Sequence, residues 1–499
     1  MSHWLNEKQL RETAPAESAA MRSPIPTQVV SNGEYVPSPQ STQQRQVERV
    51  IGELADTHGR RLGLDRRQFL KTTCGMAAAF VAMNRVYGNL FSVGVAEAAE
   101  PAAAAERLAA LSGQPVVDVQ LHFLREDFNW DGILVLGEWA KKWNPVLERE
   151  GVSLRRYKLE NFVKEVFLDS ETRIGLISGA PSDDPSHGVI GSAELARARD
   201  TLNAVAGSRR VLSHSILRPG QPGWIEEIDR ALAEWNPDSW KGYTVGDPLA
   251  PSEWPWRMDD EKLTYRGYEK IAKSNRRIVC VHKGLLPADY ETSTKHWRYA
   301  MVDDVGKAAK DWPQLTFVIY HSGLKPFLTP PDESLAQFEK TGRMDWVSDL
   351  AEVPAKYGVT NVYAELGTSF ATAAVTHPRH SAALLGTLIR GMGPDHVLWG
   401  TDSVWYGSPQ WQIEAFRRIE IPEDMRKKRG FAALGAADGP VKSAILAGNA
   451  AKLYGIDLAN LADTSRNDSL AVAKREYESA GSDRSNAAYG FIRRASQET

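Results

Sequence analysis

The chain has 499 residues, of which 42% are hydrophobic and 25% are charged, and its formal net charge at pH 7 is −3. This composition is typical of a globular protein, and the near-neutral charge excludes a strongly basic nucleic-acid-binding protein. The only two cysteines, Cys74 and Cys280, exclude a disulfide framework and a cysteine-rich zinc module. No apolar run reaches the 18 residues that a membrane-spanning helix needs.

Residues 1–98 have the pattern of a leader that carries an export signal. Arg66-Arg67 precede Phe-Leu-Lys, a short apolar stretch follows at Thr73–Met83, and Ala96-Glu97-Ala98 is a small-x-small site. A charged region, an apolar region and such a cleavage site make up an export signal, and paired arginines are typical of the twin-arginine class. We therefore expect the twin-arginine export machinery as a partner, cleavage after Ala98, and a periplasmic or secreted protein.

The alternative is an amphipathic helix that begins with two arginines. The arginines lie far from Met1, and Asn84-Arg85 interrupt the apolar stretch, which are both departures from the usual signal. Cleavage after Ala98 would leave Cys280 as the only cysteine, as suits a protein that folds in the cytoplasm before export.

Residues 115–456 alternate short β-rich runs with stretches of helical periodicity. We expect strands at Val116–Gln120, Ile174–Ser178, Val211–Leu217, Lys241–Val245, Ile278–Val281, Thr316–Tyr320, Asn361–Glu365 and His396–Gly400. We expect helices at Leu159–Leu168, Ala193–Ala206, Trp224–Trp235, Tyr265–Asn275, Val302–Asp311, Met344–Tyr357 and Ser381–Arg390.

Eight βα units predict an α/β fold, a (β/α)₈ TIM barrel. The rival is an open doubly wound sheet, which would need a glycine-rich turn after the first strand, and the sequence there is LHFLRED. Residues 457–499 are polar and predict a peripheral helix and a loose tail, which could wrap the partner subunit of a homo-oligomer.

Chemically active residues follow four of the predicted strands. They are Gln120 and His122 after the first strand, His282 after the fifth, His321 after the sixth and Asp402 after the eighth. The catalytic site of this fold lies at these strand ends, and imidazoles with a carboxylate suit a divalent metal ion such as Zn²⁺. Three protein ligands would leave a position for a water molecule, whose pKa the metal lowers.

These motifs resemble the amidohydrolase superfamily, in particular the amidohydrolase-related branch that includes aminocarboxymuconate-semialdehyde decarboxylase. The resemblance rests on the strand-1 motif from Asp118 to His122, on Phe317–Gly323, on Trp399–Ser403, and on the closing segment Ile445–Gly455. It spans about residues 115–456.

The resemblance implies that His122 and His282 are metal ligands. It implies that Asp402 is a ligand or the partner of the metal-bound water, that His321 is an acid or base beside the metal, and that Asp118 orients neighbouring groups. Asp402 and His321 are accordingly the expected catalytic residues.

Gln120 departs from the family, which has histidine at this position. Either Gln120 binds the metal weakly through its amide oxygen, or the metal uses only His122, His282 and Asp402, or the site has lost its metal. All three alternatives stay open at this point.

Substrate contacts are expected from Glu365, which ends the seventh strand, and from a cation at the mouth of the barrel. A carboxylate could be held by Arg218 or Lys283, although an ordinary ion pair is the simpler explanation of each.

We therefore expect an exported, metal-dependent hydrolase in which metal-activated water attacks an amide, ester or lactone carbonyl of a small molecule. The alternative is a metal-dependent non-oxidative decarboxylase of an aromatic or muconate-like acid, and the third interpretation is a metal-free ligand-binding barrel.

Overall fold

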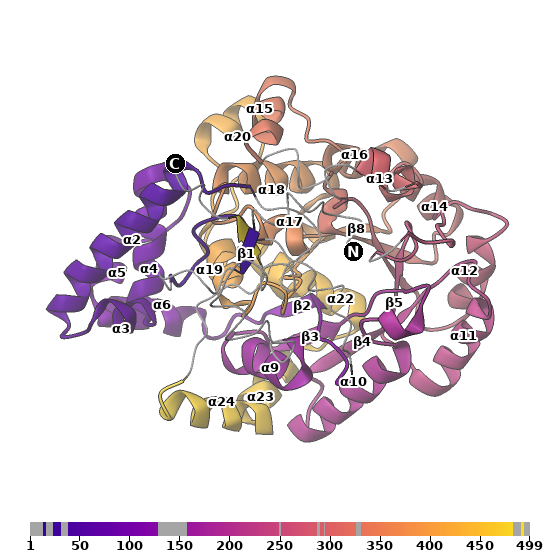
Figure 1. Ribbon diagram of the computed structural model, residues 1–499, viewed down its shortest axis with the longest axis horizontal. Coiled ribbons are helices and arrows are strands. Elements are labelled where there is room, and N and C mark those ends of the chain that lie inside the picture. Colours follow the sequence, from indigo (N-terminus) through magenta and orange to yellow (C-terminus); the bar gives the residue numbers. More distant parts are fainter. Residues whose placement is uncertain are drawn as a thin grey trace.

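The computed structural model describes residues 13–15, 23–30, 38–127, 157–248, 251–286, 290–293, 295–325, 331–482 and 491–493. Eight parallel strands form one sheet in the order of the sequence (Figure 1). They are β2 (Val117–Leu121), β3 (Ile174–Ile177), β4 (Val211–Ile216), β5 (Ser239–Tyr243), β6 (Ile278–His282), β7 (Thr316–Tyr320), β8 (Val362–Glu365) and β9 (Val397–Leu398). The predicted TIM-barrel fold is confirmed.

Helices follow the strands and surround the sheet (Figure 1). The main ones are α9 (Leu159–Val163) continued by η4 (Lys164–Leu168), α10 (Ser192–Ala206), α11 (Trp224–Arg230) continued by η6 (Ala231–Trp235), α12 (Thr264–Lys273), α14 (Val305–Asp311), α16 (Val347–Tyr357), α18 (Pro378–Met392) and α19 (Gln410–Arg418). Shorter or peripheral helices are η5 (Pro185–His187), α13 (Tyr290–Ser293), η7 (Trp297–Ala300), η8 (His321–Gly323), α15 (Pro331–Thr341), α17 (Gly367–Ala371), η9 (Pro394–His396), α20 (Glu423–Arg429), α21 (Pro440–Ser443), η10 (Ala444–Gly448) and α22 (Asn449–Tyr454).

The core of the barrel is apolar because neighbouring strands carry β-branched and aromatic residues inward. One buried cluster joins Val117, Val119, Ile174 and Leu176 to residues of β4, β6, β7 and β9. Such side chains fit the pleated, buried surface of a parallel sheet.

Residues 42–111 form a helical layer on one side of the barrel, at the left of Figure 1. Its helices are α2 (Thr42–Arg61), α3 (Arg66–Leu70), α4 (Thr73–Tyr87), α5 (Val95–Ala99) and α6 (Pro101–Leu111). We call this layer the N-terminal module. Its buried side chains belong to the same hydrophobic cluster as those of α16, α18 and α19.

The N-terminal module contacts α19 through backbone and side chains. Phe91 pairs with Ile419 in an antiparallel bridge, the Ser92 N–H donates to the Arg418 carbonyl at 2.7 Å, and Arg418 forms an ion pair with Glu97. Because both backbone and side chains of the module contact the barrel, the two pack together as one body.

This packing differs from the expectation of a separate leader over residues 1–98. The apolar stretch of the expected signal is α4, whose residues Ala77 to Met83 are at most 5% exposed. Ala98, the expected cleavage position, is 1% exposed within α5. Of the paired arginines, Arg66 binds Asp56 of α2. A short apolar stretch has the same composition in an export signal and in a buried helix, so composition alone does not separate the two.

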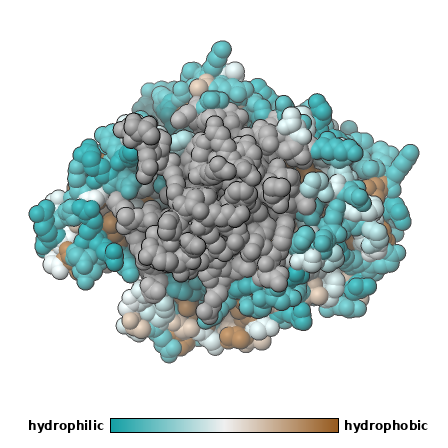
Figure 2. All heavy atoms as spheres, viewed as in Figure 1, coloured by the Kyte–Doolittle hydropathy of each residue, from teal (hydrophilic) through white to brown (hydrophobic). Residues whose placement is uncertain are grey.

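Two further helices, α23 (Leu458–Asn467) and α24 (Ser469–Ser479), lie beside α10 and η4, and the short strands β1 (Thr13–Pro15) and β10 (Phe491–Arg493) pair antiparallel. Hydrophilic residues dominate the described rim of the face in Figure 2. Among the described residues, every helix is too short or too polar to cross a membrane.

Candidate active site

The barrel closes between β2 and the segment that follows β9, and this closure assembles the site. The Asp402 N–H donates to the Gln120 carbonyl at 3.0 Å, and the His122 N–H donates to the Ser403 carbonyl at 2.6 Å. The side chains of Gln120, His122 and Asp402 are therefore held at the carboxyl ends of the first and last strands, where catalytic residues of this fold lie.

The Asp402 carboxylate is the centre of this cluster. Its Oδ1 accepts a hydrogen bond from Gln120 Nε2 at 3.0 Å and lies 3.0 Å from His122 Nε2, while Oδ2 accepts from the Thr368 hydroxyl. Burial opposes ionisation of Asp402, but the hydrogen bond and charge of His122 outweigh it and lower the pKa to about 2. Asp402 is therefore ionised, and both of its oxygens are engaged.

Both ring nitrogens of His122 have partners. Its Nδ1 lies 2.8 Å from the Ser178 carbonyl oxygen and its Nε2 lies 3.0 Å from Asp402 Oδ1. These two contacts hold the ring between the Ser178 carbonyl and the Asp402 carboxylate. The ring also stacks on Trp405 at a centroid distance of 5.7 Å.

The Gln120 amide lies between three strand ends. Its Nε2 is 3.0 Å from Asp402 Oδ1, 3.3 Å from His321 Nε2 and 3.5 Å from His122 Nε2. Its Oε1 has no hydrogen-bond partner within the described part of the chain. The amide N–H groups thus supply hydrogen bonds to the ionised Asp402 and to a neutral imidazole.

Glu365 completes the cluster from the end of β8. Its Oε2 accepts from the His321 backbone N–H at 3.0 Å, and its Oε1 has no hydrogen-bond partner among the described residues. Two glycines make room for this carboxyl: a Cβ at Gly400 would lie 1.8 Å from Glu365 Oε1, and one at Gly367 would lie 2.9 Å from it. Gly367 has a φ of +34°, which side chains rarely adopt.

Three polar atoms converge beside Gly367. The position of a Gly367 Cβ would be 2.5 Å from Gln120 Oε1, 2.9 Å from Glu365 Oε1 and 2.9 Å from His321 Nδ1. Each of these atoms lacks a hydrogen-bond partner in the described structure. Burial raises the pKa of Glu365 to about 8, so this carboxyl carries a proton at neutral pH.

Two further imidazoles of the cluster, His321 and His282, lie in surroundings that favour their neutral forms, and Lys241 is the cation beside them. Burial lowers the pKa of His321 to about 3, and it lowers the pKa of His282 well below its ordinary value. The positive charge of Lys241 on β5 acts in the same direction on both rings. Lys241 is fully buried, and its Nζ lies 3.4 Å from the centre of the Tyr320 ring.

Asp118 connects the two strands at the closure. Its Oδ1 accepts from the backbone N–H groups of Gln120 and Thr401, both at 3.1 Å, and its Oδ2 accepts from the Thr401 hydroxyl at 2.5 Å. Burial raises the pKa of Asp118 to about 7. Asp118 positions the backbone that carries the cluster.

Two residues expected to contact the substrate form ion pairs in this structure. Lys283 is fully buried in an ion pair with Asp304 at 2.8 Å and donates to the Tyr299 carbonyl at 2.6 Å. Neighbouring residues of a strand point to opposite faces, so His282 and Lys283 cannot both face the barrel interior. Arg218 pairs with Glu227 of α11, and within the described part of the chain it does not contact the cluster.

The residues present do not fit a divalent metal ion in their observed arrangement. Within the described residues, no three histidine, cysteine, aspartate or glutamate side chains form a group that could hold one. His282 lies instead against Tyr243 and His321, at ring-centroid distances of 4.5 and 4.6 Å. The group that faces Asp402 is an amide N–H of Gln120, which is a donor and not a ligand. The expected ligand set of His122, His282 and Asp402 stays a prediction.

The family model for amidohydrolases matches residues 209–456. This part of the chain, just under half of the 499 residues, is therefore similar to the amidohydrolase family. The predicted resemblance is confirmed there, and β2 and β3, which precede the matched residues, complete the same barrel.

No curated protein matches this chain. Similar solved structures include a TIM-barrel protein of Bordetella bronchiseptica, which is 13% identical, covers 70% of this chain and 99% of its own, and has a TM-score of 0.43. A 2,6-dihydroxybenzoate decarboxylase from Rhizobium is 14% identical over 69% and 99% of the two chains, with a TM-score of 0.40. A manganese complex of 5-carboxyvanillate decarboxylase from Novosphingobium aromaticivorans is 14% identical over 69% and 97%, with a TM-score of 0.39.

Sequence reasoning missed several residues of the candidate site. Thr368 and Tyr406 form a hydroxyl chain to Asp402, since Tyr406 donates to Thr368 at 3.2 Å. Ser178 acts through its carbonyl, which no side-chain pattern reveals. Gly400, directly before Thr401-Asp402, could have indicated the position of Glu365, because a glycine at such a place allows another group to approach the backbone closely.

Proposed function

We propose that this protein is an enzyme of the amidohydrolase family that catalyses non-oxidative decarboxylation of a small aromatic or muconate-like carboxylic acid. The observation that carries the proposal is the buried carboxyl of Glu365 at the end of β8, which accepts from the His321 N–H and has its Oε1 without a hydrogen-bond partner among the described residues; burial raises its pKa to about 8. A decarboxylase must deliver a proton to the carbon that loses carbon dioxide, and an acid with a pKa near the working pH does this best.

The reaction balances with the groups present. The bond between the substrate carbon and its carboxylate breaks, carbon dioxide leaves, and the electron pair stays on the carbon. That carbon takes the proton of Glu365, and water then returns a proton to the Glu365 carboxylate. The buried charge of Lys241, which already acts on the pKa of Glu365, favours the electron-rich intermediate.

Hydrolysis has less support in this arrangement because the cluster holds few bases. Asp402 is the ionised carboxylate, but its pKa of about 2 and its two occupied oxygens make it a weak acceptor of a proton from water. His321, with a pKa of about 3, is also a weak base. We derive no step through a metal ion because the donor set does not fit one.

The test is a panel of aromatic and unsaturated carboxylic acids, assayed for released carbon dioxide and for the decarboxylated product by mass spectrometry. A parallel panel of amides, esters and lactones is assayed for hydrolysis. We expect turnover in the acid panel, abolished by Glu365→Gln. Turnover only in the hydrolysis panel, or carbon dioxide release that Glu365→Gln leaves unchanged, would overturn the proposal.

A further inference from the structure

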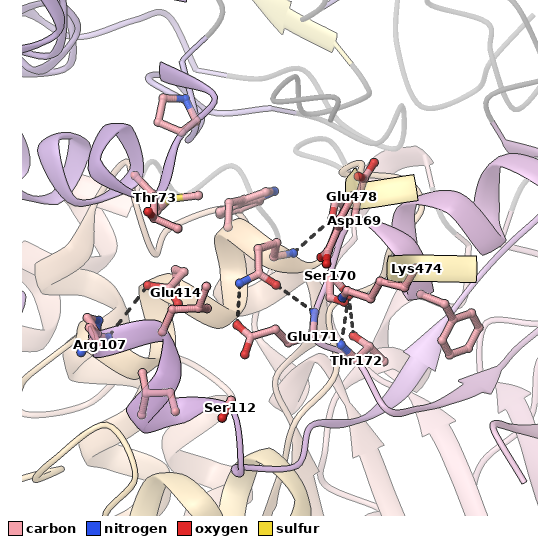
Figure 3. A pocket seen from close by; sticks show the side chains of 18 of the residues that line it. Thr73, Arg107, Ser112, Asp169, Ser170, Glu171, Thr172, Glu414, Lys474 and Glu478 are labelled. Carbon is pink, nitrogen blue, oxygen red and sulfur yellow. Dashed lines mark hydrogen bonds and ion pairs between the residues drawn. The ribbon is translucent and has the colours of Figure 1, made fainter. Parts of the chain in front are cut away.

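A cavity lies where the N-terminal module meets the side of the barrel, and it is shown in Figure 3. Its volume is about 430 Å³, within the range of small-molecule sites. Its walls come from three parts of the chain: α4 and α6 of the module, residues 167–173 and α19 of the barrel, and the C-terminal helices α23 and α24. We call it the junction cavity. None of its lining residues belongs to the candidate active site.

The lining of the junction cavity carries three more basic than acidic side chains. The basic ones are Lys71, Arg107, Arg173, Arg210, Arg418, Arg466, Lys474 and Arg475, and the acidic ones are Glu97, Asp169, Glu171, Glu414 and Glu478. Most of the acids already have cationic partners, since Glu97 and Glu414 pair with Arg418, Glu171 pairs with Arg417, and Asp169 pairs with Lys164. Arg210 pairs with Asp468, so the basic side chains that line the side formed by α23 and α24 are chiefly Arg466, Lys474 and Arg475.

Like charges are concentrated on that side. The Arg173 guanidinium donates to the Ser465 hydroxyl at 2.9 Å and to the Ser112 carbonyl at 2.8 Å, which are neutral acceptors. Burial lowers the pKa of Arg173, and the charges of Arg210 and Arg466 lower it further. A bound anion would relieve this repulsion through charge-assisted hydrogen bonds.

Another part of the lining is apolar. Leu70, Met76, Leu108, Leu111, Phe167 and Trp411 contribute to it, from the N-terminal module and the barrel. A ligand that fits both sides has one anionic group and an apolar body, because such a body gains free energy by leaving water.

We propose that the junction cavity binds a small organic acid with an anionic head at Arg173 and at the arginines of α23 and α24, and an apolar body against α4, α6 and Trp411. Because the ligand touches the N-terminal module, the barrel and the C-terminal helices together, it stabilises their association. Unlike the candidate active site, this site binds the acid without changing it.

Calorimetric titration of the full chain with octanoate tests the proposal. We expect one octanoate per junction cavity, with acetate and 1-octanol each binding at least about tenfold more weakly, since each lacks one of the two features. Arg466→Glu, on the exposed surface of α23, is expected to weaken octanoate about tenfold or more. The matched control is Arg230→Glu, an exposed arginine of α11, which should leave the affinity unchanged.

Two further measurements separate this site from the first. Glu365→Gln should leave octanoate affinity unchanged, and Arg466→Glu should leave turnover unchanged. If Arg466→Glu lowers the melting temperature, Arg475→Met serves as the second variant, with the same expected loss of affinity. Equal binding of octanoate and 1-octanol, or an affinity that survives both arginine variants, would overturn the proposal.

Discussion

The candidate active site and the junction cavity use ionisable groups in opposite ways. In the active site, carboxyls and imidazoles are buried, and burial moves Glu365 and His321 towards their neutral forms. In the junction cavity the charge resides on arginines, which stay protonated at every working pH. The first region therefore responds to pH and suits proton transfer, whereas the second responds to salt and suits binding of an anion.

The largest effect is expected from deletion of residues 1–98. This deletion tests whether the N-terminal module, which forms one wall of the junction cavity, and the barrel, which carries the active site, are parts of one body. The deletion removes α2 to α4 and most of α5, whose buried residues share one hydrophobic cluster with α16, α18 and α19. It also leaves Arg418 without Glu97. We expect no soluble folded protein, as measured by circular dichroism and gel filtration. A folded and active product would show instead that the segment is a removable leader.

Glu365→Gln should have the next largest effect, and only on the active site. Gln keeps the shape of the side chain and the oxygen that accepts from the His321 N–H. It has no acidic proton to transfer to the substrate carbon, so kcat should fall by about 10²–10⁴-fold. Steady-state kinetics on a substrate from the acid panel measures it. Glu165→Gln, which alters another fully buried glutamate on η4, is the control and should leave kcat unchanged.

The strands of the barrel could be predicted from the sequence to within one or two residues. The strand predictions were accurate, and Thr316–Tyr320 agrees at both ends, because β-branched runs bounded by turn residues are unambiguous between helices. β5 begins at Ser239, two residues before its predicted start, since Ser239 and Trp240 pair with His214 and Ser215 of β4.

Strand ends alone predicted that Gln120, His122, His321 and Asp402 would lie close together, and the structure brings them within hydrogen-bonding distances. The spacing did not predict that an amide would face the carboxylate, because this depends on side-chain rotation. The buried ion pair of Lys283 and Asp304 could not be predicted from the sequence, because it depends on tertiary contacts. Strand alternation did indicate that Lys283 and His282 point to opposite faces of the sheet.

The pH dependence of turnover sharpens the comparison. Protonated Glu365 is the active form, so kcat/KM should be level below its pKa of about 8 and fall tenfold per pH unit above it. A rate that rises between pH 7 and 9 would indicate a base instead. The free energy of unfolding should also decrease as pH rises from the ordinary glutamate pKa to about 8, because the folded chain holds this proton and the unfolded chain loses it.

The smallest expected effect is that of a chelator on the wild-type protein. Because the amide of Gln120 faces Asp402 where a third ligand would be needed, EDTA should change kcat by less than about twofold. Gln120→His is the matched variant, since an imidazole there would join His122 and Asp402 as a third metal-binding side chain. We expect Gln120→His to retain Zn²⁺ after dialysis, as measured by elemental analysis, whereas the wild type does not. A wild-type protein that retains one metal per chain would contradict this prediction. It would mean that the Gln120 amide rotates so that its oxygen faces the metal ion, and the hydrogen bonds and charges around Asp402 would then differ from those described.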